Sequence, residues 1–251
     1  KKTITFDEKA IIRLVKRYEN DPLYPLIVEQ RGLGKLIGTY LGRTQEDGRI
    51  IGGMPVGADG RIHTLFTSNP STLRSASQNP NLQNLPRPNP KDPDDLANII
   101  RNLIIAAPGH VLYARDFSGI EAVLVGYEAR LKDYIRLAKR DVHSYYTAYA
   151  LYALDKRISA NDLPLLSWDD EKLFKRLAEI KKEFGDERNG LYKHLVHAAN
   201  FGQGPKGASE KILLETGRSY QVKLVSDVMN VYFELFPGIK KWHTQILYQA
   251  H

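Results

Sequence analysis

The sequence lacks cysteine, transmembrane-length apolar runs and internal repeats over its 251 residues. The absence of cysteine excludes disulfide bonds and cysteine-ligated zinc sites. Without a long apolar run, and without a signal-peptide pattern at the N-terminus, nothing predicts association with a membrane. We therefore expect an intracellular, cytoplasmic protein.

Basic residues are in excess over acidic ones. The chain has 36 Lys and Arg against 29 Asp and Glu, a formal net charge of +7. This balance favours a polyanionic partner such as nucleic acid but does not prove one. The length fits one large domain or two closely packed ones.

Hydrophobic periodicity predicts a helix-rich α+β protein. Helices are expected over residues 7–20, 25–41, 119–137, 141–154, 168–184, 191–201, 208–216 and 221–236, and from residue 239 onward. Residues 42–60 indicate a loop or hairpin, and residues 61–67 and 112–116 indicate strands. Residues 68–95 hold six prolines and are either disordered or an ordered loop that uses amide side chains for binding.

One aspartate follows the predicted strand at residues 112–116. Asp116 ends that strand, and Glu121 lies five residues later in the next predicted helix. A carboxylate at the end of a buried strand is well suited to hold a divalent metal ion. Asp116 is equally well explained as a helix N-cap, and Glu121 as a solvated residue. The apolar neighbours of Glu121 favour a buried, functional carboxylate.

A second group lies on one predicted helix. Lys193, His197 and Phe201 are spaced i, i+4, i+8 and therefore share a helix face. The two basic groups suit phosphates, and the ring suits a base or sugar. The alternative is a surface lysine, a partly buried histidine and a core phenylalanine. The following glycine-rich segment, residues 202–207, matches a dinucleotide fingerprint, but a helix precedes it, so we interpret it as a turn.

The order of these segments resembles the family A DNA polymerases, the DNA polymerase I type. The resemblance runs from about Gly60 to Trp242. Its segments are Gly60-Arg-Ile-His-Thr with Asn79-Pro-Asn-Leu-Gln-Asn, Asp116-Phe-Ser-Gly-Ile-Glu121 as motif A, Asp141-Val-His143, residues 193–202 as motif B, and Leu235-Phe-Pro-Gly-Ile-Lys-Lys-Trp242. It implies a partial right-hand fold: a thumb remnant in residues 1–60, part of the palm in 61–140, the fingers in 141–236, and a return toward the palm in 237–251.

The resemblance also implies roles for individual residues. Asp116 would bind two Mg²⁺ ions, with the carbonyl of Phe117 assisting at one. The nucleotide-binding residues would be Gly119, Glu121, His143, Lys193, His197 and Phe201. Glu121 would be the steric gate against a ribose 2′-hydroxyl, and Phe201 in place of tyrosine implies poor acceptance of dideoxynucleotides. Arg74, Asn81, Gln83 and Asn84 would contact primer–template DNA.

Several positions depart from the family pattern. The family usually has Arg and Lys at the positions of Lys193 and His197, and often Gln at Gly119. Pro205 and Lys206 replace a Tyr-Gly pair, which leaves the template-stacking role of that tyrosine without a residue. Such departures are similar to those of viral branches of the family.

Motif C, a His-Asp-Glu hairpin, occurs nowhere in the sequence. Two-metal catalysis needs carboxylates on both sides of the metal pair. We therefore expect the second aspartate to come from outside this chain, on a second polypeptide that completes the palm. The alternatives are a catalytically incomplete module that binds primer–template DNA and a fragment of a longer chain.

Overall fold

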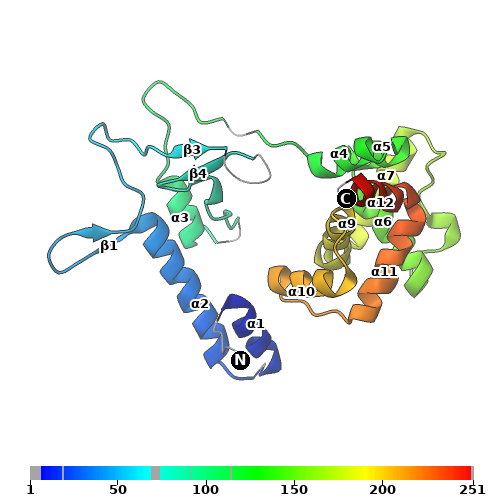
Figure 1. Ribbon diagram of the computed structural model, residues 1–251, viewed down its shortest axis with the longest axis horizontal. Helices are drawn as coiled ribbons and strands as arrows, with labels where there is room; N and C mark the ends of the chain where they lie inside the picture. The colour runs from blue at the N-terminus through cyan, green and yellow to red at the C-terminus, as the bar shows by residue number, and fades with distance from the viewer. Residues whose placement is uncertain (1–6, 19, 69–73, 91, 114, 250–251) are drawn as a thin grey trace. The chain divides into compact units, whose positions relative to one another are not determined.

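The computed structural model describes residues 7–18, 20–68, 74–90, 92–113 and 115–249. The chain divides into two compact units, Lys1–Ala114 and Arg115–His251 (Figure 1).

Unit 1 begins with two helices. Helix α1 (Glu8–Arg17) is capped by Asp7, whose carboxylate accepts a hydrogen bond from the Ala10 N–H. Helix α2 (Leu23–Leu36) packs against α1 and runs into the π-helical turn η1 (Ile37–Leu41). Strands β1 (Arg43–Thr44) and β2 (Ile50–Ile51) then form a short antiparallel hairpin, as the sequence predicted.

The rest of unit 1 contains a second small sheet. Strands β3 (Leu65–Thr67) and β4 (Ala76–Gln78) pair antiparallel, with Phe66 opposite Ser77. The short helix η2 (Leu82–Asn84) and helix α3 (Leu96–Asn102) follow. The described residues between Arg74 and Pro86 are therefore folded, which decides in favour of the ordered loop for that part of residues 68–95.

The described part of unit 2 is helical. Its α-helices are α4 (Ile120–Glu128), α5 (Lys132–Ala138), α6 (Val142–Ala150), α7 (Asp170–Glu183), α8 (Gly185–Glu187), α9 (Lys193–Asn200), α10 (Pro205–Thr216), α11 (Val222–Leu235) and α12 (Pro237–Gln249). Three short turns complete it: η3 (Leu151–Asp155), η4 (Ala160–Asp162) and η5 (Arg188–Tyr192).

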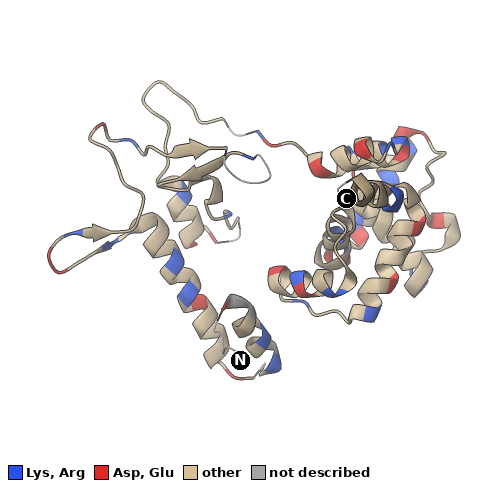
Figure 2. Ribbon diagram, in the orientation of Figure 1, with Lys and Arg blue, Asp and Glu red and all other residues tan. Residues whose placement is uncertain are grey.

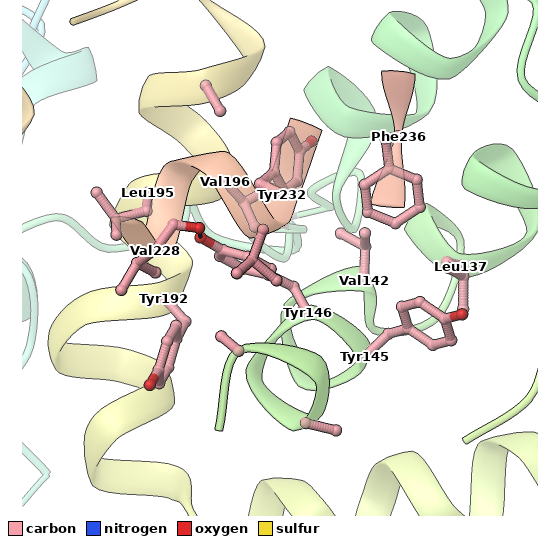
Figure 3. Packing of buried hydrophobic residues seen from close by; sticks show 14 of the residues in the cluster. Leu137, Val142, Tyr145, Tyr146, Tyr192, Leu195, Val196, Val228, Tyr232 and Phe236 are labelled. Atoms are coloured by element: carbon pink, nitrogen blue, oxygen red, sulfur yellow. Dashed lines mark hydrogen bonds between the residues drawn. The ribbon is translucent and has the colours of Figure 1, made fainter. Parts of the chain in front are cut away.

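Helices α6, α9 and α11 supply the centre of the unit 2 core. Tyr146 and Tyr232, both 0% exposed, meet there with ring centroids 5.2 Å apart in an edge-to-face arrangement (Figure 3). The Tyr146 hydroxyl donates to the Val228 carbonyl at 2.6 Å, so its polar atom has a partner inside the core. Such buried aromatic pairs contribute large apolar areas with a fixed geometry.

Most of the predicted helices are confirmed, with two corrections. The helix predicted over residues 119–137 is two helices, because Arg130 adopts φ 55° and the Leu131 N–H turns back to the Gly126 carbonyl. The turn predicted over residues 202–207 ends early, since α10 already begins at Pro205. Proline favours that first helical position because its missing N–H is not needed there.

The strand predicted over residues 112–116 is wrong. The described residues there are irregular, and Leu112 and Tyr113 are 66% and 83% exposed. An apolar run forms a strand only when a neighbouring strand accepts its hydrogen bonds. Both described sheets have two strands, and neither includes this segment.

The helix-rich α+β prediction is confirmed: helices dominate, and the strands form two small antiparallel sheets. The thumb, palm and fingers boundaries stay predictions. Among the described residues, no helix combines the length and apolar character that crossing a bilayer requires.

Candidate nucleotide-binding site

Helix α9 presents one exposed face. Lys193, His197 and Phe201, at the start, middle and C-cap of the helix, are exposed. The opposite side is buried: Leu195, Val196, Ala198 and Ala199 are each at most 3% exposed. The predicted shared face is therefore present, and the alternative of a core phenylalanine is wrong, since Phe201 is 60% exposed.

A carboxylate from helix α4 meets this face. The Glu121 Oε2 atom lies 3.5 Å from the His197 Nδ1 atom. The rings of His197 and Phe201 are 4.8 Å apart in an edge-to-face arrangement. Burial lowers the pKa of His197, and Lys211 lowers it further, whereas Glu121 and Glu215 oppose that change. An acid, an imidazole and an aromatic ring thus stand in a row across two helices.

His143 lies close to the same charges but is more deeply placed. Burial lowers its pKa to about 4, and the positive charges of Arg188, Lys193 and His197 act in the same direction. Among the described residues, its buried Nδ1 atom has no hydrogen-bond partner. His143 is therefore a neutral imidazole at neutral pH, so it can meet a phosphate only as a hydrogen-bond donor and not as a cation.

A nearly buried ion pair, Asp141 with Arg188, links the start of α6 to the turn that precedes α9. The sequence did not predict this pair. The Arg188 Nη2 atom donates to the Asp141 Oδ1 atom at 2.6 Å, and Arg188 Nε donates to the Ser144 hydroxyl at 3.0 Å. Burial opposes ionisation of Asp141, but the hydrogen bonds from Arg188 and Ser144 outweigh it and lower its pKa. Asp141 is also the N-cap of α6, since its carboxylate accepts from the Ser144 N–H.

This ion pair joins the start of η5, just before α9, to the start of α6, just before His143. Its partners are 47 residues apart, so helical spacing gave no signal for it.

A hydrogen-bond network also fixes the C-terminal end of α9. The Asn200 side chain donates to the Tyr134 hydroxyl at 2.9 Å and accepts from the Tyr232 hydroxyl at 2.6 Å. The Asn200 carbonyl lies 2.9 Å from His243 Nε2 on α12. Because Asn200 immediately precedes Phe201, three helices set the position of the exposed ring.

The segment before α4 is exposed. Phe117 is 77% exposed, and Asp116 and Gly119 are exposed as well. Gly119 is the N-cap of α4 with a left-handed φ of 63°, so the alternative of Asp116 as the helix cap is wrong. Without a side chain, Gly119 can reach a ligand only through its backbone.

The donor set for a metal ion is incomplete within the described residues. They contain no group of three or more His, Asp or Glu side chains placed to hold an ion. Asp116 offers one exposed carboxylate. Magnesium ions are commonly held by one or two carboxylates together with substrate phosphates. Asp116 could therefore supply one ligand of a magnesium site, but it does not form a complete site by itself.

The four predicted DNA-contacting residues belong to unit 1. Asn81 is half-buried and caps η2 by accepting from the Gln83 N–H, whereas Arg74, Gln83 and Asn84 are exposed. The Asn84 carbonyl accepts a hydrogen bond from the Tyr40 hydroxyl at 2.5 Å.

The loop that carries Asn81, Gln83 and Asn84 is held by Ser77. The buried Ser77 hydroxyl accepts from the Leu82 N–H at 3.0 Å and shares a hydrogen bond with Thr64. The loop is thus anchored to the β3–β4 sheet by side-chain hydroxyls.

Charge is mixed on the outer helices of unit 2. Helices α7 and α10 carry Lys and Arg interspersed with Asp and Glu (Figure 2). Mixed signs produce no extended field of one sign. The charged faces of these helices are thus solvated, and the α9 face is the better candidate for a polyanionic ligand.

Comparison with known proteins identifies relatives. A model of DNA polymerase family A matches residues 1–161. The chain is 27% identical over 249 residues to DNA polymerase I of Helicobacter pylori strain J99, which covers 96% of this chain and 22% of that protein. It is 34% identical over 155 residues to DNA polymerase I of Deinococcus radiodurans, covering 61% of this chain and 15% of that protein.

A thermostable DNA polymerase I of Thermus aquaticus is 32% identical over 129 residues, which are 50% of this chain and 14% of that protein. The chain thus spans about a fifth or less of the length of these relatives. Helix α9 lies outside the family-model match and inside the Helicobacter alignment, which covers nearly the whole chain.

Proposed function

Because this chain belongs to DNA polymerase family A, we propose that it takes part in template-directed DNA synthesis, transferring a nucleotide from a dNTP to a primer 3′-hydroxyl. The observation that carries the proposal is the exposed α9 face of Lys193, His197 and Phe201 with Glu121 beside it. A cation, an imidazole and an aromatic ring on one exposed face match the phosphates, sugar and base of a nucleotide.

The chain's own residues would bind and orient the nucleotide. Lys193 supplies the permanent positive charge for the triphosphate, and neutral His143 supplies at most one N–H. Phe201 offers a ring for stacking. Its backbone position is fixed by the neighbouring residue Asn200, whose side chain bonds to the hydroxyls of Tyr134 and Tyr232. Glu121 occupies the position at which a ribose 2′-hydroxyl would be crowded. The reaction is an in-line attack of the primer hydroxyl on the α-phosphate, with pyrophosphate as the leaving group.

Asp116 is the proposed catalytic carboxylate and, with the Phe117 carbonyl, the proposed ligand of two Mg²⁺ ions. Bound Mg²⁺ would activate the attacking hydroxyl and neutralise charge on the leaving group. The exposure of Asp116 leaves it accessible for this role. A second aspartate must come from outside these 251 residues, since the sequence holds no His-Asp-Glu.

The proposed partners are primer–template DNA, a dNTP and a second polypeptide that carries motif C and the rest of the palm. The exposed apolar residues Leu112 and Tyr113 support a missing palm partner, because a strand would cover them. Arg74, Asn81, Gln83 and Asn84 are the proposed contacts to the DNA. The second candidate, a non-catalytic primer–template binding module, is favoured by the incomplete metal donor set.

Primer extension tests the proposal. The chain is assayed with Mg²⁺ and dNTPs, alone and with a polypeptide carrying the missing motif. We expect no extension alone, extension when completed, and loss of extension in the completed Asp116→Ala enzyme. Extension by Asp116→Ala contradicts the metal assignment. DNA binding without extension under every condition favours the binding module.

DNA affinity gives an independent check. Neutralised phosphates release counterions, so binding of primer–template should weaken steeply as salt is raised. The slope of log affinity against log salt measures this. A flat response contradicts DNA as the ligand.

A further inference from the structure

The contact between helix α4 and helix α9 joins the two groups that would meet the sugar and the triphosphate. His197 Nδ1 is 3.5 Å from Glu121 Oε2, and the two side chains are 45% and 38% exposed. Both groups are therefore accessible to a ligand while they touch each other. The ring centroids of His197 and Phe201 are 4.8 Å apart in an edge-to-face arrangement. The imidazole is thus close to both a carboxylate and an aromatic ring.

The orientation of the His197 imidazole decides whether its N–H can donate to the Glu121 carboxylate or to a phosphate. A neutral imidazole has a single N–H donor. Burial and Lys211 lower the pKa of His197, which favours the neutral form at neutral pH. When Nδ1–H faces Glu121, the remaining nitrogen is an acceptor and cannot donate to a phosphate. Lys193 is then the residue of this face that neutralises the negative charge of the phosphates.

We infer that His197 is a positioning residue for sugar selection, which holds the Glu121 carboxylate against the place of the nucleotide 2′ carbon. This inference rests on the proposed function and extends it, because the resemblance assigns His197 to the triphosphate instead. A carboxylate that is held in place crowds a 2′-hydroxyl more effectively than one that is free to rotate away.

Equilibrium binding of dATP and ATP to the full chain tests the inference, with Mg²⁺ and a primer–template whose next template base is thymine. The variants are His197→Ala, Glu121→Ala, the double variant and Lys193→Ala. We expect His197→Ala to lower the dATP-over-ATP affinity ratio about two- to fivefold, the range of an exposed pair. The same change in the Glu121→Ala background should leave the ratio unaltered.

Two further variants separate positioning from phosphate binding. Lys193→Ala should weaken dATP and ATP by the same factor and preserve their ratio. His197→Gln retains a donor and should recover part of the lost preference. Each variant is compared with the parent by its thermal unfolding midpoint, which should change little because His197 and Glu121 are partly exposed.

The outcomes are distinguishable. If His197→Ala weakens both nucleotides equally, or if its effect on the ratio persists without Glu121, the inference is wrong and the proposed function stands. If the parent chain binds neither nucleotide in the presence of primer–template, both alone and when completed by the polypeptide carrying motif C, the proposed function fails and the inference fails with it.

Discussion

The two units support their exposed residues in different ways. Unit 2 places the α9 face on a continuous core that includes fully buried Tyr134, Tyr146 and Tyr232. The described part of unit 1 buries few side chains, and they are scattered: Ile11, Tyr40, Ser77, Pro80, Ala97 and Ile100. Its amide-bearing loop is held by local hydrogen bonds around Ser77. Packing therefore sets geometry in unit 2, whereas hydroxyl contacts set it in unit 1.

The largest expected effect comes from the buried ion pair of unit 2. Arg188→Met leaves the Asp141 carboxylate, whose side chain is 14% exposed, without its cation. We expect a loss of about 3–5 kcal/mol in the free energy of unfolding, measured by urea denaturation. The double variant Asp141→Leu with Arg188→Met removes both charges and should recover much of that loss.

Arg218→Met is the matched control. Arg218 also pairs with an aspartate, Asp186, at 2.6 Å, but both side chains are exposed. Its replacement should cost much less. Equal losses of stability for the two arginine variants would show that burial does not distinguish the two ion pairs. That result would contradict the idea that the packed core of unit 2 makes the Asp141–Arg188 pair important.

A matched pair of isoleucines compares the two units next. Ile239 on α12 and Ile100 on α3 are both 0% exposed. Each change to alanine should cost about 2–4 kcal/mol from lost burial and the cavity left behind. We expect Ile239→Ala to lower the stability of unit 2 and Ile100→Ala to lower that of unit 1. Hydrogen exchange measures the protection of each unit separately. A uniform shift across both units by either variant would show one cooperative unit.

A pH dependence should be specific to unit 2. His143 has a folded pKa of about 4 against 6.5 for an unperturbed histidine. Between these values the unfolded chain binds the extra proton, so unit 2 loses stability as the pH falls from 6.5 toward 4. The contribution is at most about 3 kcal/mol. Asp141, whose pKa is lowered below 3.8, adds its loss only at more acidic pH.

His143→Asn should flatten the stability curve between pH 6.5 and 4, as measured by denaturation at each pH. His110→Asn, at an exposed position in unit 1, is the control and should leave the curve of unit 2 unchanged. An unaltered slope in His143→Asn would show that its burial does not control protonation.

The smallest effect is expected in unit 1. Ser77→Ala removes the hydroxyl that the Leu82 N–H donates to and should cost about 1–2 kcal/mol in unit 1. Because Ser77 positions the loop that carries Asn81, Gln83 and Asn84, primer–template affinity should fall with it. Ser68→Ala, at an exposed position, is the control. Unchanged loop protection in hydrogen exchange would argue against local anchoring.

The sequence predicted what depends on neighbours along the chain. The shared face of Lys193, His197 and Phe201 followed from helical spacing. It depends only on positions along one helix. The helix positions followed for the same reason.

Contacts between distant segments were not predictable in the same way. The Asp141–Arg188 pair and the Tyr134–Asn200 hydrogen bonds join helices that periodicity treats separately. The strand ending at Asp116 failed because pairing needs a second strand, which an apolar run by itself does not specify. The contact between Glu121 and His197 depends on how α4 packs against α9.

Gly119 constrains how this chain can diverge from its relatives. Its φ of 63° is a conformation that residues with side chains rarely adopt, and an added Cβ would lie 3.0 Å from the Ala138 carbonyl. A side chain at this position, such as the glutamine that the resemblance implies for other members, would therefore strain the backbone that enters α4. An exchange of Gly119 for a residue with a side chain is therefore expected to require a compensating change in the turn that leads into α4.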